Sequence, residues 1–428
     1  METVSAISHY NKKLEKINFE SEKMNVDFMR LIDRRIGPPI CFALSCIHGL
    51  RKILSKPGFI KKPKKILFIE MSEMGSIVLA YSLFKKTKEL FPDAELYFLT
   101  FKENRYAIDI LDIIPEENVV TINSNNFISL LLTTISTLWK LRRRKISLAV
   151  DMELFARFTT ILSYFSGAKN RVGYFRYHNE GLYRGNFQTH RVAFNPHLHM
   201  TYNLLNLIHA VSSPHEDVPL AKKPIAEKDI VMPKIKISEN ARMAILKKLE
   251  DENKDIVKTK KMILLNPNAS DIVPVRRWPV ENYIELAKLL LKNDGVYIVF
   301  TGVELEKKGV DIICDAVSSE RCINFAGKTT FSELVDLYNI ADVLITNDSG
   351  PVHFSTVTDI KTFAFFGPET PKLYGPFGRN CHVFYSNYAC SPCVSAFNHR
   401  KSPCNDNKCL KAISVMEVYN EVKKQILV

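Results

Sequence analysis

Short apolar runs alternate with longer amphipathic segments along the chain. Ile66–Ile69 and Leu96–Leu99 are continuous apolar runs, which are typical of parallel strands buried on both faces. Between them, apolar residues recur with helical spacing from Ile77 to Leu90, and Pro92 ends that pattern. This succession predicts a strand–helix–strand unit.

The same succession recurs in both halves of the chain. In the first half we expect a strand at Val119-Val120, a helix from Phe127 to Leu141 and a strand from Leu148 to Asp151. In the second half we expect strands at Met262–Leu265, Tyr297–Phe300 and Val343–Thr346, with helices at Pro279–Leu291, Leu334–Ile340 and from Ser414 onward. Such alternation predicts two doubly wound α/β domains, whose ligands bind beyond the carboxyl ends of the strands.

The pattern lapses between residues 210 and 260 into sequence rich in proline and charge, as expected of a linker with a solvated helix. A chain of 428 residues has room for two large domains and an appendage. We therefore predict a helical extension at 1–63, a Rossmann-like domain at 64–225, a linker at 226–260, a second Rossmann-like domain at 261–411 and an amphipathic helix at 412–428.

The charge balance favours anionic partners. Lys and Arg number 59 against 46 Asp and Glu, a formal net charge of +13. No recognisable nucleic-acid module accompanies this charge, so nucleic acid is not an expected partner. The basic runs Lys61–Lys65 and Arg142–Lys145 are expected as solvated loops, with contact to phosphates or headgroups as the alternative.

The N-terminal segment shows no signal peptide, so we expect a cytoplasmic protein whose nine cysteines stay reduced. Ile36–Leu50 is apolar but is interrupted by Pro38-Pro39 and is too short to span a bilayer, which takes about 20 residues. The segment either packs on the first domain or lies in a membrane interface. In the second case the residues presented to lipid are Cys41, Phe42, Leu44, Ile47 and Leu50.

The most specific motif follows the strand predicted at Val343–Thr346. That strand ends in Asp348-Ser349-Gly350 and runs directly into a helix, which directs a hydroxyl and free backbone N–H groups at one point and favours a diphosphate. Glycine at 350 permits a close approach. Alone, the tripeptide is equally compatible with a plain helix cap. The motif continues through Phe366-Gly367-Pro368 and Tyr374–Gly378.

The run from Asn347 to Gly378 resembles the signature of glycosyltransferase family 9, the heptosyltransferases. Ile69–Val78, Asn266–Ser270 and Arg276–Pro279 resemble further motifs of that family in the same order. The resemblance implies a GT-B fold: an α/β protein of two doubly wound Rossmann-like domains facing a central cleft. The first domain would bind the acceptor and the second the nucleotide sugar.

The resemblance also implies an activity and a place of action. It implies an inverting, metal-independent transfer of heptose or a similar sugar from a nucleotide-diphosphate donor, such as ADP-heptose, to a lipid-linked lipopolysaccharide or surface-glycan acceptor. No cofactor is required. The enzyme would work on the inner face of the cytoplasmic membrane, as a peripheral protein.

Family resemblance assigns roles at the donor site. Asp348 would contact sugar hydroxyls, Ser349 and Gly350 would hold the diphosphate, and His353 would support their loop. A cation that precedes Trp-Pro would neutralise the leaving group. The candidates for that cation are Arg276 and Arg277.

The chain departs from the family at its first loop. Family members carry an Asp as general base directly after a glycine, whereas Ser76 follows Gly75 here. Serine is not a suitable base unassisted. We expect Glu73 to take the role, then Glu153 or Asp151, all near strand ends that face the cleft. The alternative is a catalytically impaired homologue that binds a glycan or a nucleotide sugar.

Four cysteines near the C-terminus form the spacing C-x2-C-x10-C-x4-C. This spacing is compatible with a structural zinc site, and the alternative is a set of buried thiols that stabilise an irregular loop. Catalysis would not need the metal. The residues are Cys390, Cys393, Cys404 and Cys409.

Overall fold

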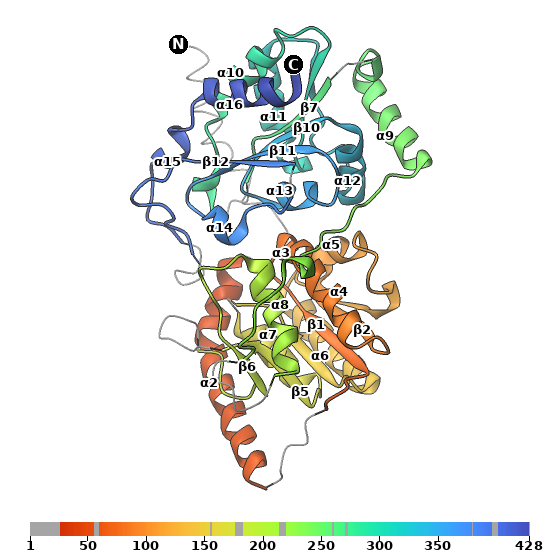
Figure 1. The fold of residues 1–428 in the computed structure, drawn as a ribbon, viewed down its shortest axis with the longest axis vertical. Helices are drawn as coiled ribbons and strands as arrows, with labels where there is room; N and C mark the ends of the chain where they lie inside the picture. Colours follow the sequence, from red (N-terminus) through yellow and green to blue (C-terminus); the bar gives the residue numbers. More distant parts are fainter. Residues whose placement is uncertain are drawn as a thin grey trace. The chain divides into compact units, whose positions relative to one another are not determined.

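The computed structural model divides into two compact units, one within Glu22–Met232 and the other within Pro233–Val428, which we call the N-terminal and C-terminal units (Figure 1). The boundary falls inside the predicted linker. The structure describes residues 26–54, 60–154, 156–175, 183–213, 220–258, 261–269, 273–378, 380–395 and 401–427.

The N-terminal unit contains a parallel sheet in the order β3-β2-β1-β4-β5-β6. Its strands are β1 (Lys65–Ile69), β2 (Glu95–Phe101), β3 (Val119–Ile122), β4 (Leu148–Asp151), β5 (Asn170–Tyr174) and β6 (His190–Val192). Its α-helices are α2 (Val26–Leu54), α3 (Met74–Leu79), α4 (Tyr81–Leu90), α5 (Arg105–Asp109), α6 (Phe127–Arg144), α7 (Arg157–Phe165) and α8 (Met200–Val211). Single 3-10 turns lie at η2 (Lys102–Asn104), η3 (Glu116–Asn118) and η4 (Glu227–Asp229).

Helices cover both faces of this sheet, because successive side chains of a strand point to opposite faces. On β1, Leu67 and Ile69 share a buried cluster with Leu141 of α6 and Leu162 of α7. Phe68 points the other way and packs edge-on against Phe84 of α4, with ring centroids 4.9 Å apart. The continuous apolar runs of the sequence are therefore strands buried on both faces, as predicted.

Helix α2 is continuous through Pro38 and Pro39, so the expectation that the prolines interrupt the segment is wrong. Cys41 and Leu44 are buried against α7 and Phe187, which corrects the assignment of these two residues to lipid. Phe42, Ile47 and Leu50 are exposed. Among the helices that the structure describes, none has the length and apolar character needed to cross a bilayer.

A glycine lets α2 approach α7 closely. A Cβ at Gly37 would lie 2.6 Å from Cδ of Arg157, so a larger residue there would collide with the first turn of α7. Asp33 of α2 caps α7 from outside: its Oδ1 accepts hydrogen bonds from the backbone N–H groups of Arg157 and Phe158, at 2.8 and 2.9 Å. These contacts hold α2 against the domain.

The basic run Arg142–Lys145 belongs to a helix terminus and not to a solvated loop. Arg142, Arg143 and Arg144 form the last turn of α6, and Lys145 ends the helix in a left-handed conformation with φ 55°. Cations at this end interact favourably with the helix dipole. The guanidinium groups also bind carbonyls: Arg142 donates to the oxygen of Phe165 at 2.8 Å.

The C-terminal unit contains a parallel sheet in the order β12-β11-β10-β7-β8-β9. Its strands are β7 (Lys261–Asn266), β8 (Val296–Phe300), β9 (Cys322–Asn324), β10 (Val343–Asn347), β11 (Lys361–Phe366) and β12 (Cys381–Tyr385). Its α-helices are α9 (Glu239–Glu252), α10 (Val280–Leu290), α11 (Lys307–Val317), α12 (Phe331–Ile340), α13 (Gly350–Ser355), α14 (Pro371–Tyr374), α15 (Lys408–Lys411) and α16 (Val415–Val422). Single short turns lie at η5 (Ile256–Lys258), η6 (Pro274–Arg276), η7 (Glu304–Glu306) and η8 (Lys423–Leu427).

Helices α9 and α16, which flank the predicted second domain in the sequence, pack on the C-terminal unit. Val415, Val418 and Val422 of α16 are buried in its core, which confirms the packed amphipathic helix. Helix α9, expected as a solvated helix of the linker, buries Ile245 and Leu249. It also pairs with α12 through Lys248 and Glu333, whose Nζ and Oε1 lie 2.8 Å apart.

Candidate functional site

Each sheet reverses its strand order at one point. In the N-terminal unit the point lies between β1 and β4, and in the C-terminal unit it lies between β7 and β10. The loops that leave the carboxyl ends of two such strands diverge to opposite sides of the sheet, and the crevice between them is where open α/β sheets bind ligands. The predicted site residues follow these four strands.

Asn347 ties together the two loops at the β7/β10 edge. Its Nδ2 donates to the carbonyl oxygen of Pro267 at 2.8 Å, and its Oδ1 accepts from the backbone N–H of Trp278, also at 2.8 Å. The ring of Trp278 is fully buried and stacks on Phe365 with centroids 4.4 Å apart. Residues 266–269, Arg276–Pro279 and Asn347–Gly350 therefore meet at one edge.

The structure separates the roles of the two arginines. Nη1 of Arg276 lies 3.5 Å from Oδ2 of the buried Asp348, next to the end of β10. Arg277 donates from Nε and Nη2 to the carbonyl oxygen of Ala269, at 3.1 and 2.6 Å. Arg276 thus places its charge beside Asp348, whereas Arg277 holds the loop that follows β7.

Ser349 and Gly350 begin helix α13, as predicted. Oγ of Ser349 donates to the carbonyl oxygen of Asn347 at 3.2 Å, so the Ser349 side chain does not cap the first turn of the helix. A Cβ at Gly350 would come no closer than 3.7 Å to Phe354, which is an ordinary contact. Packing therefore does not require glycine at this position. His353 is buried within the same short helix.

Two polar residues at this edge were not among the predicted site residues. Asn268 is buried, and its Nδ2 has no hydrogen-bond partner among the residues that the structure describes. Glu369 is a buried carboxylate just after β11. Asn268 lies inside the motif Asn266–Ser270, and Glu369 directly follows the motif Phe366–Pro368. Their positions inside or next to these motifs could have marked both residues as candidates for the site.

At the β1/β4 edge, Glu73 and Ser76 form a pair on one loop. Glu73 is the N-cap of α3 and is partly exposed, and Gly75 and Ser76 lie in the first turn of that helix. Oγ of the buried Ser76 donates to Oε2 of Glu73 at 3.1 Å. The serine therefore orients the carboxylate that was expected to replace the family base.

Glu153 and Glu70 are buried side by side next to this loop. Oε1 of Glu153 accepts from the backbone N–H of Ser72 at 2.8 Å. Burial raises the pKa of Glu70 well above its ordinary value, and the neighbouring Glu153 carboxylate, which shares a hydrogen bond with it, raises that pKa further. Glu70, which follows β1 directly, was not among the predicted site residues.

Asp151 is enclosed at the end of β4. Its Oδ2 lies 2.5 Å from Nη2 of Arg184, and both side chains are buried. Burial raises the pKa of Asp151 to about 6, although the Arg184 charge opposes that rise. Of the three carboxylates expected to face a cleft, Asp151 and Glu153 are buried in their unit and Glu73 is partly exposed.

Residues 140–402 match the family model of glycosyltransferase family 9 (heptosyltransferase). The match covers more than half of the chain and includes all three motifs of the β7/β10 edge. The chain belongs to glycosyltransferase family 9. The loop with Glu73 and Ser76 precedes the matched range.

Curated family-9 relatives include lipooligosaccharide heptosyltransferase 2 of Campylobacter jejuni, which is 32% identical to this chain over 181 residues. That alignment covers 41% of this chain and 55% of the relative. This family-9 chain therefore spans about half the length of the curated relative that it matches.

Solved structures of the family share the fold. The structure of E. coli ADP-heptose LPS heptosyltransferase II is 19% identical, with a TM-score of 0.65 over 85% of this chain and 98% of that one. A family-9 glycosyl transferase from Veillonella parvula is 17% identical, with a TM-score of 0.67 over 85% and 97%. The predicted GT-B fold is thereby confirmed.

The cysteines near the C-terminus of this family-9 chain are free thiols. Cys390 is exposed, Cys393 and Cys404 are intermediate, and Cys409 is buried in the core of the C-terminal unit. Burial raises the pKa of the Cys409 thiol to about 11. Within the described part of the chain, no group of three or more His, Cys, Asp or Glu is placed to hold a metal ion. The zinc alternative stays a prediction.

Proposed function

We propose that this chain transfers heptose or a similar sugar from a nucleotide-diphosphate donor, such as ADP-heptose, to a lipopolysaccharide or other surface-glycan acceptor. The observation that carries the proposal is the meeting of Arg276 and Asp348 at the β7/β10 edge of a family-9 chain. The names of the C. jejuni and E. coli relatives support the choice of sugar and acceptor. A glycan-binding role without catalysis is not favoured, because the matched family is one of enzymes.

The donor diphosphate is assigned to the β7/β10 edge. Arg276 neutralises the charge that develops on the leaving diphosphate, which removes the need for a metal ion or another cofactor. The N–H groups at the start of α13 and the hydroxyl of Ser349 bind phosphate oxygens, and Asp348 accepts hydrogen bonds from sugar hydroxyls. Packing leaves Gly350 unexplained, which supports a close approach of the ligand there.

The acceptor hydroxyl is assigned to the β1/β4 edge. Its oxygen attacks the anomeric carbon, the bond from that carbon to the diphosphate oxygen breaks, and the nucleoside diphosphate leaves. Attack opposite the leaving group inverts the anomeric configuration. Glu73 accepts the hydroxyl proton, and Ser76 orients the Glu73 carboxylate through their hydrogen bond.

Titration with ADP and with ADP-heptose tests the donor site. Asp348→Asn should weaken ADP-heptose binding by roughly tenfold or more, because it removes the charge of the acceptor of the sugar hydroxyls. Ser349→Ala should weaken the binding of both ligands by a similar factor, because it removes a hydroxyl at the diphosphate. Asp359→Asn, an exposed carboxylate on the same unit, is the matched control. Unchanged affinity in both site variants, with the fold intact, would exclude this edge as the donor site.

We further propose that the enzyme works as a peripheral protein on the inner face of the cytoplasmic membrane. A lipid-linked acceptor presents its sugars at a bilayer surface, so an enzyme that docks there shares a plane with its substrate. The net charge of +13 supports attraction to anionic headgroups.

A further inference from the structure

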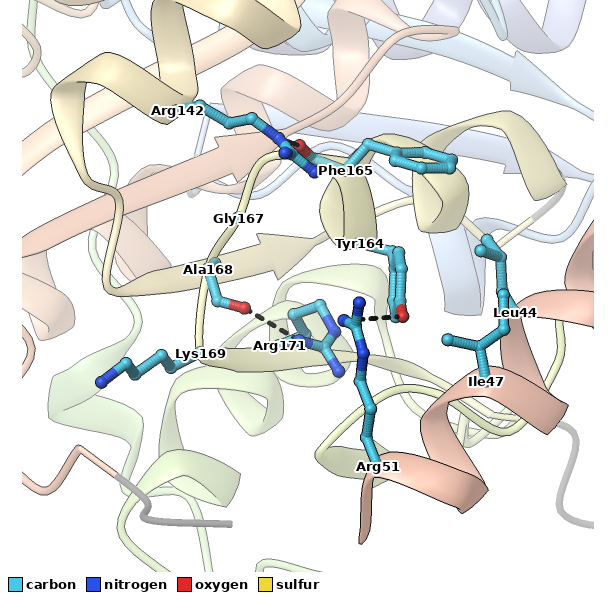
Figure 2. A pocket seen from close by; sticks show the side chains of 10 residues that line it. All are labelled: Leu44, Ile47, Arg51, Arg142, Tyr164, Phe165, Gly167, Ala168, Lys169 and Arg171. Atoms are coloured by element: carbon cyan, nitrogen blue, oxygen red, sulfur yellow. Dashed lines mark hydrogen bonds between the residues drawn. The ribbon is translucent and has the colours of Figure 1, made fainter. Parts of the chain in front are cut away.

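A cationic cavity lies on the N-terminal unit, away from the β1/β4 edge. It has a volume of about 420 Å3 and is lined by α2, the last turn of α6, the end of α7 and the start of β5 (Figure 2). Four of its ten lining residues are cations, and none is acidic. These cations are Arg51, Arg142, Lys169 and Arg171.

The cations gather around an aromatic ring. Figure 2 shows the guanidinium groups of Arg51 and Arg171 beside Tyr164, to whose hydroxyl oxygen Arg51 donates at 3.3 Å. Arg171 is anchored by hydrogen bonds to the carbonyl oxygens of Ala168 and Phe187, at 2.8 and 2.7 Å. A concave site with several cations, one of them anchored, and an aromatic wall suits a phosphate group.

Local electrostatics agree with a site of excess positive charge. The pKa of Arg171 is lowered to about 10, mainly by burial and to a smaller extent by the charge of Arg51. The pKa of His48 on α2 is also lowered, first by burial and then by four neighbouring cations. An anion in the cavity would relieve this repulsion.

Two helices that border the cavity expose apolar side chains to solvent. On α6, six large apolar residues are 50–69% exposed: Phe127, Ile128, Leu131, Leu132, Ile135 and Trp139. On α2 from residue 42 onward, the exposed large apolar residues are Phe42, Ile47, Leu50, Ile53 and Leu54. The C-terminal end of α2 projects beyond the rest of its unit in Figure 1. We call this surface, with the cavity, the α2–α6 face.

Both helices lie on the same side of the sheet. Helix α6 packs with α7 on the cluster that contains Leu67 and Ile69, and α2 packs on α7 through Cys41 and Leu44. Both helices also end in basic turns at the cavity, with Arg51 and Lys52 on α2 and the arginines on α6. Apolar stripes that end in cations are typical of helices lying in a membrane interface.

A tryptophan–arginine contact on α6 also favours a membrane interface. The guanidinium of Arg143 lies 3.5 Å from the ring centroid of the exposed Trp139. Tryptophan and arginine together favour the headgroup level of a bilayer, where the ring meets apolar chains and the cation meets phosphate. A second copy of the chain is a poor occupant of this face, because it would bring two cationic surfaces together.

We propose that the α2–α6 face docks on a bilayer, with the phosphate headgroup of an anionic phospholipid in the cavity and the exposed apolar side chains among the acyl chains. This inference rests on the membrane location proposed above and names the surface and the lipid that provide it. It assigns a role to α2 and α6 that is separate from the donor site.

Vesicle sedimentation tests the proposal, with phosphatidylcholine vesicles compared with vesicles that also contain phosphatidylglycerol. The full chain should bind the anionic vesicles more tightly. Arg51→Gln with Lys169→Gln should weaken that binding by about 25-fold, because each cation near an anionic surface contributes about fivefold. Lys85→Gln with Lys88→Gln, an equal charge change at exposed positions of α4 on the opposite face of the sheet, should have a smaller effect. Equal losses from the two pairs would contradict a headgroup in the cavity.

A second set of variants tests the apolar contact. Ile135→Ser with Trp139→Ser should abolish most binding to both kinds of vesicle, whereas Leu90→Ser on the opposite face of the sheet should not change it. ADP affinity should stay at the wild-type value in all these variants, which separates a failure of docking from a failure of the donor site. The proposal would be overturned if the chain with Ile135→Ser and Trp139→Ser sedimented with vesicles like the wild type. It would also be overturned if the wild type formed a dimer in solution and these two substitutions dissociated that dimer.

Discussion

At the scale of single residues, the choice of general base depends on how each carboxylate is enclosed. Glu73 is partly exposed and held by Ser76, whereas Asp151 is fully buried and paired with Arg184. Glu73→Gln keeps the shape of the side chain and removes its basicity, so turnover should fall roughly a hundredfold with donor affinity nearly unchanged. Steady-state kinetics and ADP titration measure the two effects. Full activity of Glu73→Gln together with loss of activity in Glu153→Gln would move the role to Glu153.

The buried pair of Glu70 and Glu153 makes a prediction about pH. The pKa of folded Glu70 is raised above its ordinary value of 4.5, so its contribution to stability is complete below that pH and is lost as pH rises through the raised pKa. Glu70→Gln mimics the protonated acid and should escape this loss. The Tm of the variant minus that of the wild type should therefore increase from pH 5 to pH 8. A constant difference across this range would show that Glu70 keeps an ordinary pKa.

At the scale of elements, α2 stabilises the N-terminal unit by capping another helix. Asp33→Ala removes the acceptor of two backbone N–H groups of α7 and the partner of Arg157. We expect a loss of about 1–3 kcal/mol in the free energy of unfolding, measured by urea denaturation. Asp27→Ala, which removes an exposed pair with Arg30 on the same helix, should cost less than about 0.5 kcal/mol. Similar losses in the two variants would mean that the cap is not formed.

Other elements show where sequence patterns were sufficient. The strands at 66–69 and 343–346 and the helix at 334–340 follow from the pattern of apolar residues, and the structure has them. Helix α7 and strand β5 were not predicted, because α7 buries Arg157, Thr159 and Ser163 and β5 buries Asn170. Buried polar groups that satisfy one another hide the apolar periodicity that sequence analysis relies on.

At the scale of the whole molecule, the order of motifs predicted the family and fold better than the details of the site. Arg276 and Arg277 are equivalent in the sequence, and only their hydrogen-bond partners distinguish them. The sequence shows only that Glu70 follows a strand, and its interaction with Glu153 is evident only in the structure. Helix α2 continues through two prolines because its packing against α7 overrides their local preference.

The central claim is that this chain transfers a sugar from a nucleotide-diphosphate donor, and mass spectrometry of the product tests it most directly. The chain is incubated with ADP-heptose and a lipopolysaccharide acceptor that lacks heptose. We predict a product heavier than the acceptor by one heptose residue, formed together with ADP, and its loss in Asp348→Asn. An acceptor of unchanged mass, in a sample where the wild-type chain binds ADP-heptose, would contradict heptosyl transfer by this protein.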